Sequence, residues 1–554
     1  MLLQRLQDEL HTGDRARRPG RFRIPLGGRH RRGRHHLLPG GRGHAGASRR
    51  GPAVVVRRHG VYASRRHREV PVALRTVAGR PAFPGCAGGA ARGVRVIPRL
   101  DPGTRVLAQG RVLVGGRPRR VLCLDRAQAG EVTRWRAGRP VSGAHRALAR
   151  LLVEAGLLRP EPGAGGPRDA EVTAVVPVHG RVRELAACLA GLRGLAVIVV
   201  DDGSPDGEAV SKVVSDAGAS YVRRETRGGP AAARNTGLAA VTTPYVAFVD
   251  SDCVLQPGWL DRLLPHFADE EVAAVAPRVV SYDAGRGWLS RYEAARSALD
   301  MGDTASVVRP DGLVPYVPTA ALVVRRAAAG AGFDERLPLG EDVDFVWRLA
   351  ASGRQVRYEP GAKVAHRHRV RLGAWLARRV EYGTAVAALD RRHPGAIPAL
   401  DASAWGVLAW AAAVCAPGGA AARAGLAAAC VAAHAADLAG ELPGEPARAA
   451  ALAAADTLTA GRLAGASVSQ VWWPLALPAA IAVPRLRLPL VAALVLPALA
   501  EWAERRPPLD PVRYVAAHVL DDVVGAVGVW KGMLRERTFR PLLPRLRRTR
   551  SGGP

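Results

Sequence analysis

YVAFVDSDCVLQPGWL, residues 245–260, runs from an apolar segment directly into two aspartates that are separated by one residue. The apolar residues 246–249 predict a buried strand, and Asp250 and Asp252 follow at its end. Because side chains alternate along a strand, the two carboxylates are expected to point the same way, with Ser251 opposite. A hard cation such as Mg²⁺ or Mn²⁺ would relieve their repulsion. Taken alone, the same pattern also fits a solvated acidic turn.

Residues 171–370 alternate between strand and helix patterns around this segment. VTAVVPV, residues 172–178, is a continuous apolar run typical of a strand buried on both faces. A helical segment, a second strand within VIVVDDGS, and a glycine-rich turn with a helix, RGGPAAARNTG, come before residue 245. This order predicts an α/β domain with a doubly wound, Rossmann-like sheet. Ligands of such sheets bind beyond the carboxyl ends of the strands.

Charged side chains follow the other strands at the same expected edge. Asp201 and Asp202 end the second strand and could accept hydrogen bonds from a base or a ribose. A helix N-cap or an Asx turn explains these two aspartates equally well. Arg227 and Arg234 belong to the glycine-rich element, where they could pair with a phosphate or an acid. The alternative for that element is an ordinary loop followed by a surface helix.

Two further segments carry groups that suit catalysis. GEDVDFVWRL, residues 340–349, opens a helix with Glu341 and Asp342, one of which could act as a general base. The helix dipole alone also favours acids at that position. His366 follows the strand-like run QVRYEPGAKVA and could add an imidazole ligand to the aspartate-bound cation. A structural histidine is the alternative there.

Six motifs, VVPV, VIVVDDGS, RGGPAAARNTG, FVDSDC, GEDVDF and VAHRH, occur in this order, and with them residues 171–370 resemble the inverting family-2 glycosyltransferases of GT-A fold. The resemblance implies a catalytic base, Asp342 preceded by Glu341, and an Mn²⁺ or Mg²⁺ held by Asp250, Asp252 and His366. It also implies a set of residues that bind the nucleotide-sugar donor: Pro177, Asp201, Asp202, Arg227, Arg234 and Asp250. No Gln-x-x-Arg-Trp motif follows, which argues against a processive synthase.

Residues 96–160 combine short apolar strands with a helix that places Leu148, Leu151, Leu152 and Ala155 on one face. They resemble winged-helix peptide-recognition domains of cofactor maturation systems, and residues 161–170 form a linker to the GT-A domain. With the apolar C-terminal region, this order resembles the glycosyltransferases of mycofactocin systems. That resemblance implies transfer of glucose, from UDP-glucose or a similar donor, to a peptide-derived redox cofactor or its precursor. The alternatives are a polyprenyl phosphate or cell-envelope glycan acceptor, or a basic scaffold that binds nucleotide sugars or nucleic acid without catalysis.

The charge balance is strongly basic, with 80 Lys+Arg against 48 Asp+Glu, and almost all of the excess is arginine. Residues 1–95 are rich in glycine, arginine and histidine and have no strand or helix period, so no packed core is expected there. They form either a basic arm for nucleic acid or anionic lipid, or else a disordered tail or a stretch outside the native reading frame. We favour a disordered tail or a stretch outside the reading frame and expect no nucleic-acid partner. Six scattered cysteines without a CxxC pair, and no signal peptide, favour a reducing cytoplasm.

Residues 371–535 are expected to be helical, with an apolar composition from about residue 405, and residues 536–554 form a basic tail. No apolar run reaches the roughly 20 uninterrupted residues of a spanning helix. Helices that lie on or dip into the membrane would still fit, and the basic tail would add attraction to anionic lipid. We therefore expect membrane association with the catalytic domain on the cytoplasmic face. An alanine-rich helical domain that covers the catalytic sheet is the alternative.

Overall fold

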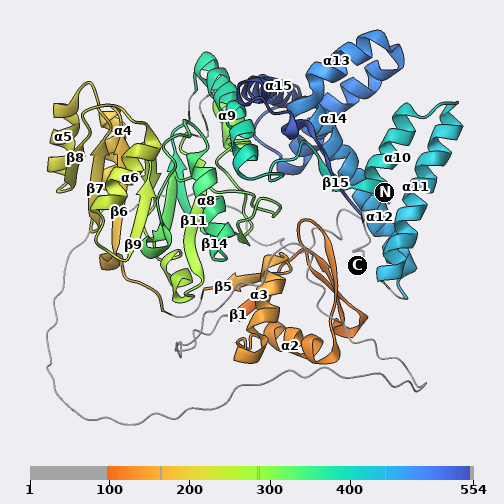
Figure 1. Cartoon of the computed structure of the whole chain (residues 1–554), viewed down its shortest axis with the longest axis horizontal. Helices are drawn as coiled ribbons and strands as arrows, with labels where there is room; N and C mark the ends of the chain where they lie inside the picture. Colours follow the sequence, from red (N-terminus) through yellow and green to blue (C-terminus); the bar gives the residue numbers. More distant parts are fainter. Residues whose placement is uncertain are drawn as a thin grey trace. The chain divides into compact units, whose positions relative to one another are not determined.

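The computed structural model describes residues 97–548, except 163–164, 284, 286, 369 and 443. The expected basic arm, residues 1–95, lies outside the described residues, as do residues 549–554 of the expected tail. Within residues 171–370 a nine-stranded sheet forms the centre of the catalytic domain (Figure 1). Its strands follow the spatial order β10, β14, β11, β13, β9, β6, β7, β8, with β12 beside β14. The strands are β6 (Val172–Val178), β7 (Ala196–Asp201), β8 (Ser220–Arg223), β9 (Tyr245–Val249), β10 (Cys253–Leu255), β11 (Val272–Ser281), β12 (Ser306–Val307), β13 (Ala321–Arg325) and β14 (Gln355–His366).

Strand directions divide this sheet into two parts. β8, β7, β6 and β9 run parallel, as the βαβ pattern predicts. β13 then pairs antiparallel with both β9 and β11, and β10 pairs antiparallel with β14. The prediction of a doubly wound parallel sheet therefore holds only for β8, β7, β6 and β9. β13 runs antiparallel because a long connection, and not a crossover helix, precedes it. The result is a mixed sheet of GT-A type.

Alternate side chains of the parallel strands feed two cores, one on each face of the sheet. Ala174 and Val176 of β6 pack with α4 and α5, whereas Val175 of β6 and Phe248 of β9 pack with α6 and α8. The period of two explains why these strands are apolar along their whole length. The helices of this domain are α4 (Val182–Ala190), α5 (Gly207–Asp216), α6 (Pro230–Ala240), α7 (Gly287–Ala295) and α8 (Glu341–Ala351).

Residues 97–161 form a small module of strands and helices. Three of its strands form an antiparallel sheet of order β2-β3-β4, and β1 pairs with β5. In α3, Leu148 and Leu152 are buried as the helical pattern predicts. The elements are β1 (Ile97–Leu100), β2 (Arg105–Leu107), β3 (Val112–Gly115), β4 (Arg120–Cys123), α2 (Arg126–Arg136), α3 (Arg146–Glu154) and β5 (Leu158–Glu161).

The chain beyond residue 371 is largely helical, as expected. Two of its helices, α9 and α15, approach so closely that a Cβ added to Gly528 would lie 2.1 Å from the carbonyl oxygen of Val380. Small residues at this crossing therefore let two backbones touch. The elements are α9 (Leu372–Arg392), β15 (Asp401–Ser403), α10 (Ala404–Cys415), α11 (Ala420–Glu441), α12 (Pro446–Ser467), α13 (Trp473–Ala482), α14 (Arg487–Arg505), α15 (Pro511–Glu536) and β16 (Arg545–Arg547).

Among the described residues, one helical stretch, Pro484–Arg505, is long and apolar enough to cross a membrane by length and composition. The sequence pattern alone did not give this length, because Arg485, Arg487 and Pro497 interrupt the apolar run while the helix continues past them. Large apolar side chains of this stretch face outward, with Leu488 78% and Leu496 58% exposed. The helices of this region thus do not simply bury their apolar faces against one another.

Candidate active site

A buried arginine links the acid at the end of β9 to the acid that begins α8. Arg234, in α6, donates one hydrogen bond to Asp250 Oδ1 at 2.7 Å and another to Glu341 Oε1 at 2.8 Å. Arg234 is 4% exposed, so its guanidinium forms both ion pairs away from bulk solvent. Arg234, which was predicted to contact the donor and could also pair with an acid, fixes the relative positions of two acidic motifs. These two ion pairs are hard to break, because separating either one would leave a buried charge without a partner.

Glu341 and Asp342 begin α8 but differ in their surroundings. Glu341 is buried and engaged by Arg234, whereas Asp342 is half-buried and, among the described residues, accepts a hydrogen bond only from the Val343 amide, at 2.8 Å. Burial, together with the neighbouring charge of Glu341, raises the pKa of Asp342 to about 6 against the opposing charge of Arg234. A carboxylate with a pKa near neutrality is suited to accept a proton. Of the two acids, Asp342 has the properties of a base.

Asp252, the second aspartate after β9, contacts a different set of side chains. Asp252 Oδ1 lies 3.3 Å from Nε2 of His366, and Asp252 Oδ2 forms an ion pair with Arg181. Burial alone would raise the pKa of Asp252, but its hydrogen bond with His366 and the charge of Arg181 lower this pKa to about 2. Asp252 is therefore a permanent anion at neutral pH.

The expectation that Asp250 and Asp252 point the same way is wrong. β9 ends at Val249, and residues 250–253 form a turn in which the Cys253 amide donates to the Asp250 carbonyl at 3.0 Å. A period of two applies only inside a strand, so it does not reach these residues. The turn directs Asp250 toward Arg234 and Asp252 toward His366, and Ser251 is buried.

The side chains at this turn supply some, but not all, of the ligands that a divalent cation needs. Within the described residues, no three histidine, cysteine or acidic side chains already form a group that could hold a metal ion. Asp252 and His366 are nevertheless adjacent, and the buried Nδ1 of His366 has no hydrogen-bond partner in the described part of the chain. Mg²⁺ and Mn²⁺ commonly take one or two carboxylates and complete their shell with water and phosphate oxygens. Asp250, Asp252 and His366 are compatible with that mode.

Asp202 organises the glycine-rich turn before α6. Its Oδ1 accepts a hydrogen bond from the Gly228 amide at 2.9 Å, and its Oδ2 accepts one from the Gly229 amide at 2.7 Å. Arg224 donates to the same carboxylate at 2.9 Å. Asp202 thus lies at the carboxyl edge of β7, where it was expected, and its side chain shapes the loop that carries Arg227.

Asp201, predicted as a donor-binding residue, is completely buried. Its carboxylate accepts hydrogen bonds from the Ser204 amide at 2.8 Å, Tyr221 at 2.7 Å and Arg223 at 2.6 Å. These bonds, despite the effect of burial, lower the pKa of Asp201. Asp201 lies two positions after Val199 and therefore shares the face of β7 that packs into a buried core.

The other predicted donor residues lie at the same edge with fewer contacts. Pro177 is half-buried near the end of β6, paired with Val200 of β7, and Arg227 is exposed and has no ion pair in the described chain. Sequence reasoning did not find Arg181 and Arg224, which pair with Asp252 and Asp202. Both arginines directly follow the carboxyl ends of strands, β6 and β8, and that placement was the available signal.

The family described as "Glycosyl transferase family 2" matches residues 173–330. The "Pre-mycofactocin glycosyltransferase" of Mycobacterium tuberculosis is 39% identical over 469 residues, which cover 81% of this chain and 97% of that protein. The "Succinoglycan biosynthesis protein ExoU" of Rhizobium meliloti is 30% identical over 186 residues, covering 31% of this chain and 53% of that one. A Pyrobaculum calidifontis mannosyltransferase solved with GDP-Man and Mn²⁺ superposes with a TM-score of 0.33 at 20% identity, covering 54% of this chain and 82% of that chain.

Proposed function

Since the chain belongs to glycosyltransferase family 2 and is close to the pre-mycofactocin glycosyltransferase, we propose that it transfers a hexose, glucose by preference, from a nucleotide sugar to mycofactocin or its peptide-derived precursor. The observation that supports this most is the identity of 39% across 97% of the mycobacterial relative, which covers 81% of this chain. A winged-helix-like module at residues 97–161 would present the peptide-derived acceptor to the GT-A domain at residues 171–370.

We propose that Asp342 removes the proton from the acceptor hydroxyl. Its raised pKa, about 6, leaves it ionised at neutral pH while keeping it basic enough to accept that proton. The hydroxyl oxygen forms a bond to the anomeric carbon as the bond to the diphosphate oxygen breaks, with inversion and no covalent sugar–enzyme intermediate. Glu341 and Arg234 hold the base in place through their ion pair.

The donor would bind at the carboxyl ends of β6, β7 and β9. Asp202 and the Gly228–Gly229 amides that it fixes would face the nucleoside, with Pro177 and Arg227 beside them. Asp201, which is buried and hydrogen-bonded to Ser204, Tyr221 and Arg223, would have a structural role at the end of β7. Asp250, Asp252 and His366 would hold Mn²⁺ or Mg²⁺, which neutralises charge on the diphosphate leaving group when bound.

We also propose that the protein associates with the cytoplasmic face of a membrane through its C-terminal helices. The exposed apolar side chains between residues 484 and 505 and the apolar composition of that stretch support this. The same feature favours a second candidate acceptor, a polyprenyl phosphate, which would lie at the same surface.

Product analysis separates these proposals. The full chain would be incubated with Mn²⁺, a panel of nucleotide sugars and three acceptors: mycofactocin precursor, polyprenyl phosphate and a cell-envelope glycan. We expect the precursor to gain the mass of a hexose from UDP-glucose, and NMR of the product to show an anomeric configuration opposite to that of the donor. Transfer to polyprenyl phosphate alone would reject the proposed acceptor, and retention of configuration would reject the single-displacement mechanism.

A further inference from the structure

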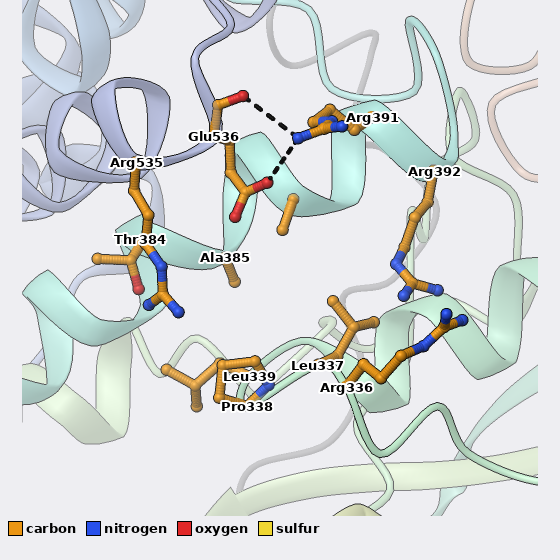
Figure 2. Close-up of a pocket in the computed structure, with 11 residues that line it drawn as sticks. Arg336, Leu337, Pro338, Leu339, Thr384, Ala385, Arg391, Arg392, Arg535 and Glu536 are labelled. Carbon is orange, nitrogen blue, oxygen red and sulfur yellow. Dashed lines mark hydrogen bonds and ion pairs between the residues drawn. The ribbon is translucent and has the colours of Figure 1, made fainter.

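A cavity of about 450 Å³ lies apart from the acids of the candidate active site, between the ends of α9 and α15 and the loop that precedes α8 (Figure 2). Its wall contains four arginines from three separate segments: Arg336, Arg391, Arg392 and Arg535. Glu536 is the acidic residue among the side chains that line it. A cavity lined in this way concentrates positive charge in a recess that solvent screens less than an open surface.

The arginines of this cavity outnumber the acids that they contact. Arg336 and Arg392 share one carboxylate, Asp334, at 2.9 Å and 2.6 Å. Arg391 pairs with Glu536 at 3.1 Å. Arg535 is exposed and has no ion pair or hydrogen bond in the described part of the chain. Arg392 also lies 3.8 Å from Asp344, so three carboxylates contact three of the four guanidinium groups, and the group of Arg535 is left without one.

Helix dipoles explain only part of this arrangement. Arg391, Arg392 and Arg535 lie in the last turns of α9 and α15, where a positive charge is favourable at any position around the helix. Arg336 belongs to a loop and gains nothing from a dipole. All four side chains nevertheless line the same recess, and Figure 2 shows them distributed around it. A common anionic ligand accounts for that convergence.

We propose that this arginine cavity binds a phosphate group. A guanidinium presents paired donors that match phosphate oxygens, and Arg535 offers a guanidinium that pairs with no carboxylate in the described part of the chain. The phosphate could belong to a soluble molecule or to a phospholipid headgroup. The second source suits Leu534 and Phe539, apolar residues close to Arg535 in sequence whose side chains are 64% and 53% exposed.

The cavity is also connected to the catalytic helix. Leu337, Pro338 and Leu339 form part of its wall and lead directly into Gly340 and the start of α8. Arg392 lies 3.8 Å from Asp344, a buried residue of α8 that accepts a hydrogen bond from Arg348 at 2.8 Å. A phosphate that draws Arg392 into the cavity would change the charges around the first turn of α8, which carries Asp342.

Isothermal titration calorimetry of the full chain with inorganic phosphate tests this site. EDTA in the buffer removes metal-assisted phosphate binding at the acids of the active site. The test variant is Arg535→Gln, and the matched control is Arg537→Gln, an exposed arginine at the same helix end that does not line the cavity. We expect saturable binding that is roughly tenfold weaker in Arg535→Gln, the loss typical of one charge-assisted hydrogen bond, and unchanged in Arg537→Gln.

Vesicle sedimentation then identifies the source of the phosphate. If the source is a headgroup, vesicles of phosphatidylcholine with phosphatidic acid will bind Arg535→Gln more weakly than Arg537→Gln, and phosphatidylcholine alone will not distinguish them. If the source is soluble, the two variants will bind both vesicles alike and differ only in calorimetry. Absence of saturable phosphate binding by the wild type, or equal losses in the two variants, would overturn the proposal. Glycosyl transfer is measured separately, so neither result depends on the proposed acceptor.

Discussion

Replacement of Glu341 by glutamine should move the acidic limb of the pH–rate profile downward. Burial and the charge of Glu341, in that order, raise the pKa of Asp342 from 3.8 to about 6. That shift of about two units corresponds to roughly 3 kcal/mol against the ionised form. Glutamine keeps the shape of the side chain but removes its charge, and it leaves the opposing charge of Arg234 less neutralised. Both effects lower the pKa of Asp342, so we expect a decrease of about one unit, or roughly 1.4 kcal/mol.

The assay is kcat as a function of pH, with donor, acceptor and metal all saturating. The base must be ionised to act, so the wild-type rate should fall as pH decreases through about 6. In Glu341→Gln the midpoint should lie near pH 5, with a somewhat lower plateau because a weaker base accepts the proton less readily. Glu208→Gln, an exposed change in α5, is the control and should leave the midpoint unchanged. A midpoint that stays at pH 6 or rises in Glu341→Gln would refute the reasoning.

Three further outcomes follow from the contacts described above. Arg234→Met leaves two acids unpaired, so urea unfolding should show a loss of about 3 kcal/mol, and an unchanged midpoint would contradict the buried bridge. Asp252→Asn should raise the Mn²⁺ concentration for half-maximal transfer about tenfold, whereas the exposed Asp261→Asn should not; equal curves would remove Asp252 from the metal site. Gly528→Ala should lower stability by about 2 kcal/mol in thermal unfolding because its Cβ meets a carbonyl, while Gly525→Ala, with open space around its Cβ, should not.

The strands of the catalytic domain could be predicted well because their apolar runs are long and end in charged residues. β6 and β14 begin and end where the sequence pattern placed them, and β7 overlaps the predicted second strand. The antiparallel β13 could not be predicted, because pairing direction depends on the path of the chain and not on the residues of the strand. The long helix at residues 484–505 was missed because the apolar run was taken to begin after Arg485 and Arg487.

The sequence indicated which acids belong to the candidate site, but not which basic side chain each acid contacts. A strand end indicated Asp250 and Asp252, and a helix start indicated Asp342. Arg234 and His366 contact the first two of these acids. Which carboxylate each cation would contact depends on the turn after Val249 and on side-chain burial. The arginine cavity depends on three segments that lie far apart in sequence, so no local pattern could reveal it.

The central claim is that Asp342 takes the proton while other residues bind the donor. The most direct measurement is the single-turnover transfer rate of Asp342→Asn beside its affinity for the nucleotide sugar, with the exposed Asp216→Asn as control. General-base catalysis of this kind contributes roughly 10²–10⁴-fold, so we expect a loss of that size in rate and an unchanged Kd. Transfer by Asp342→Asn at the wild-type rate would contradict the claim.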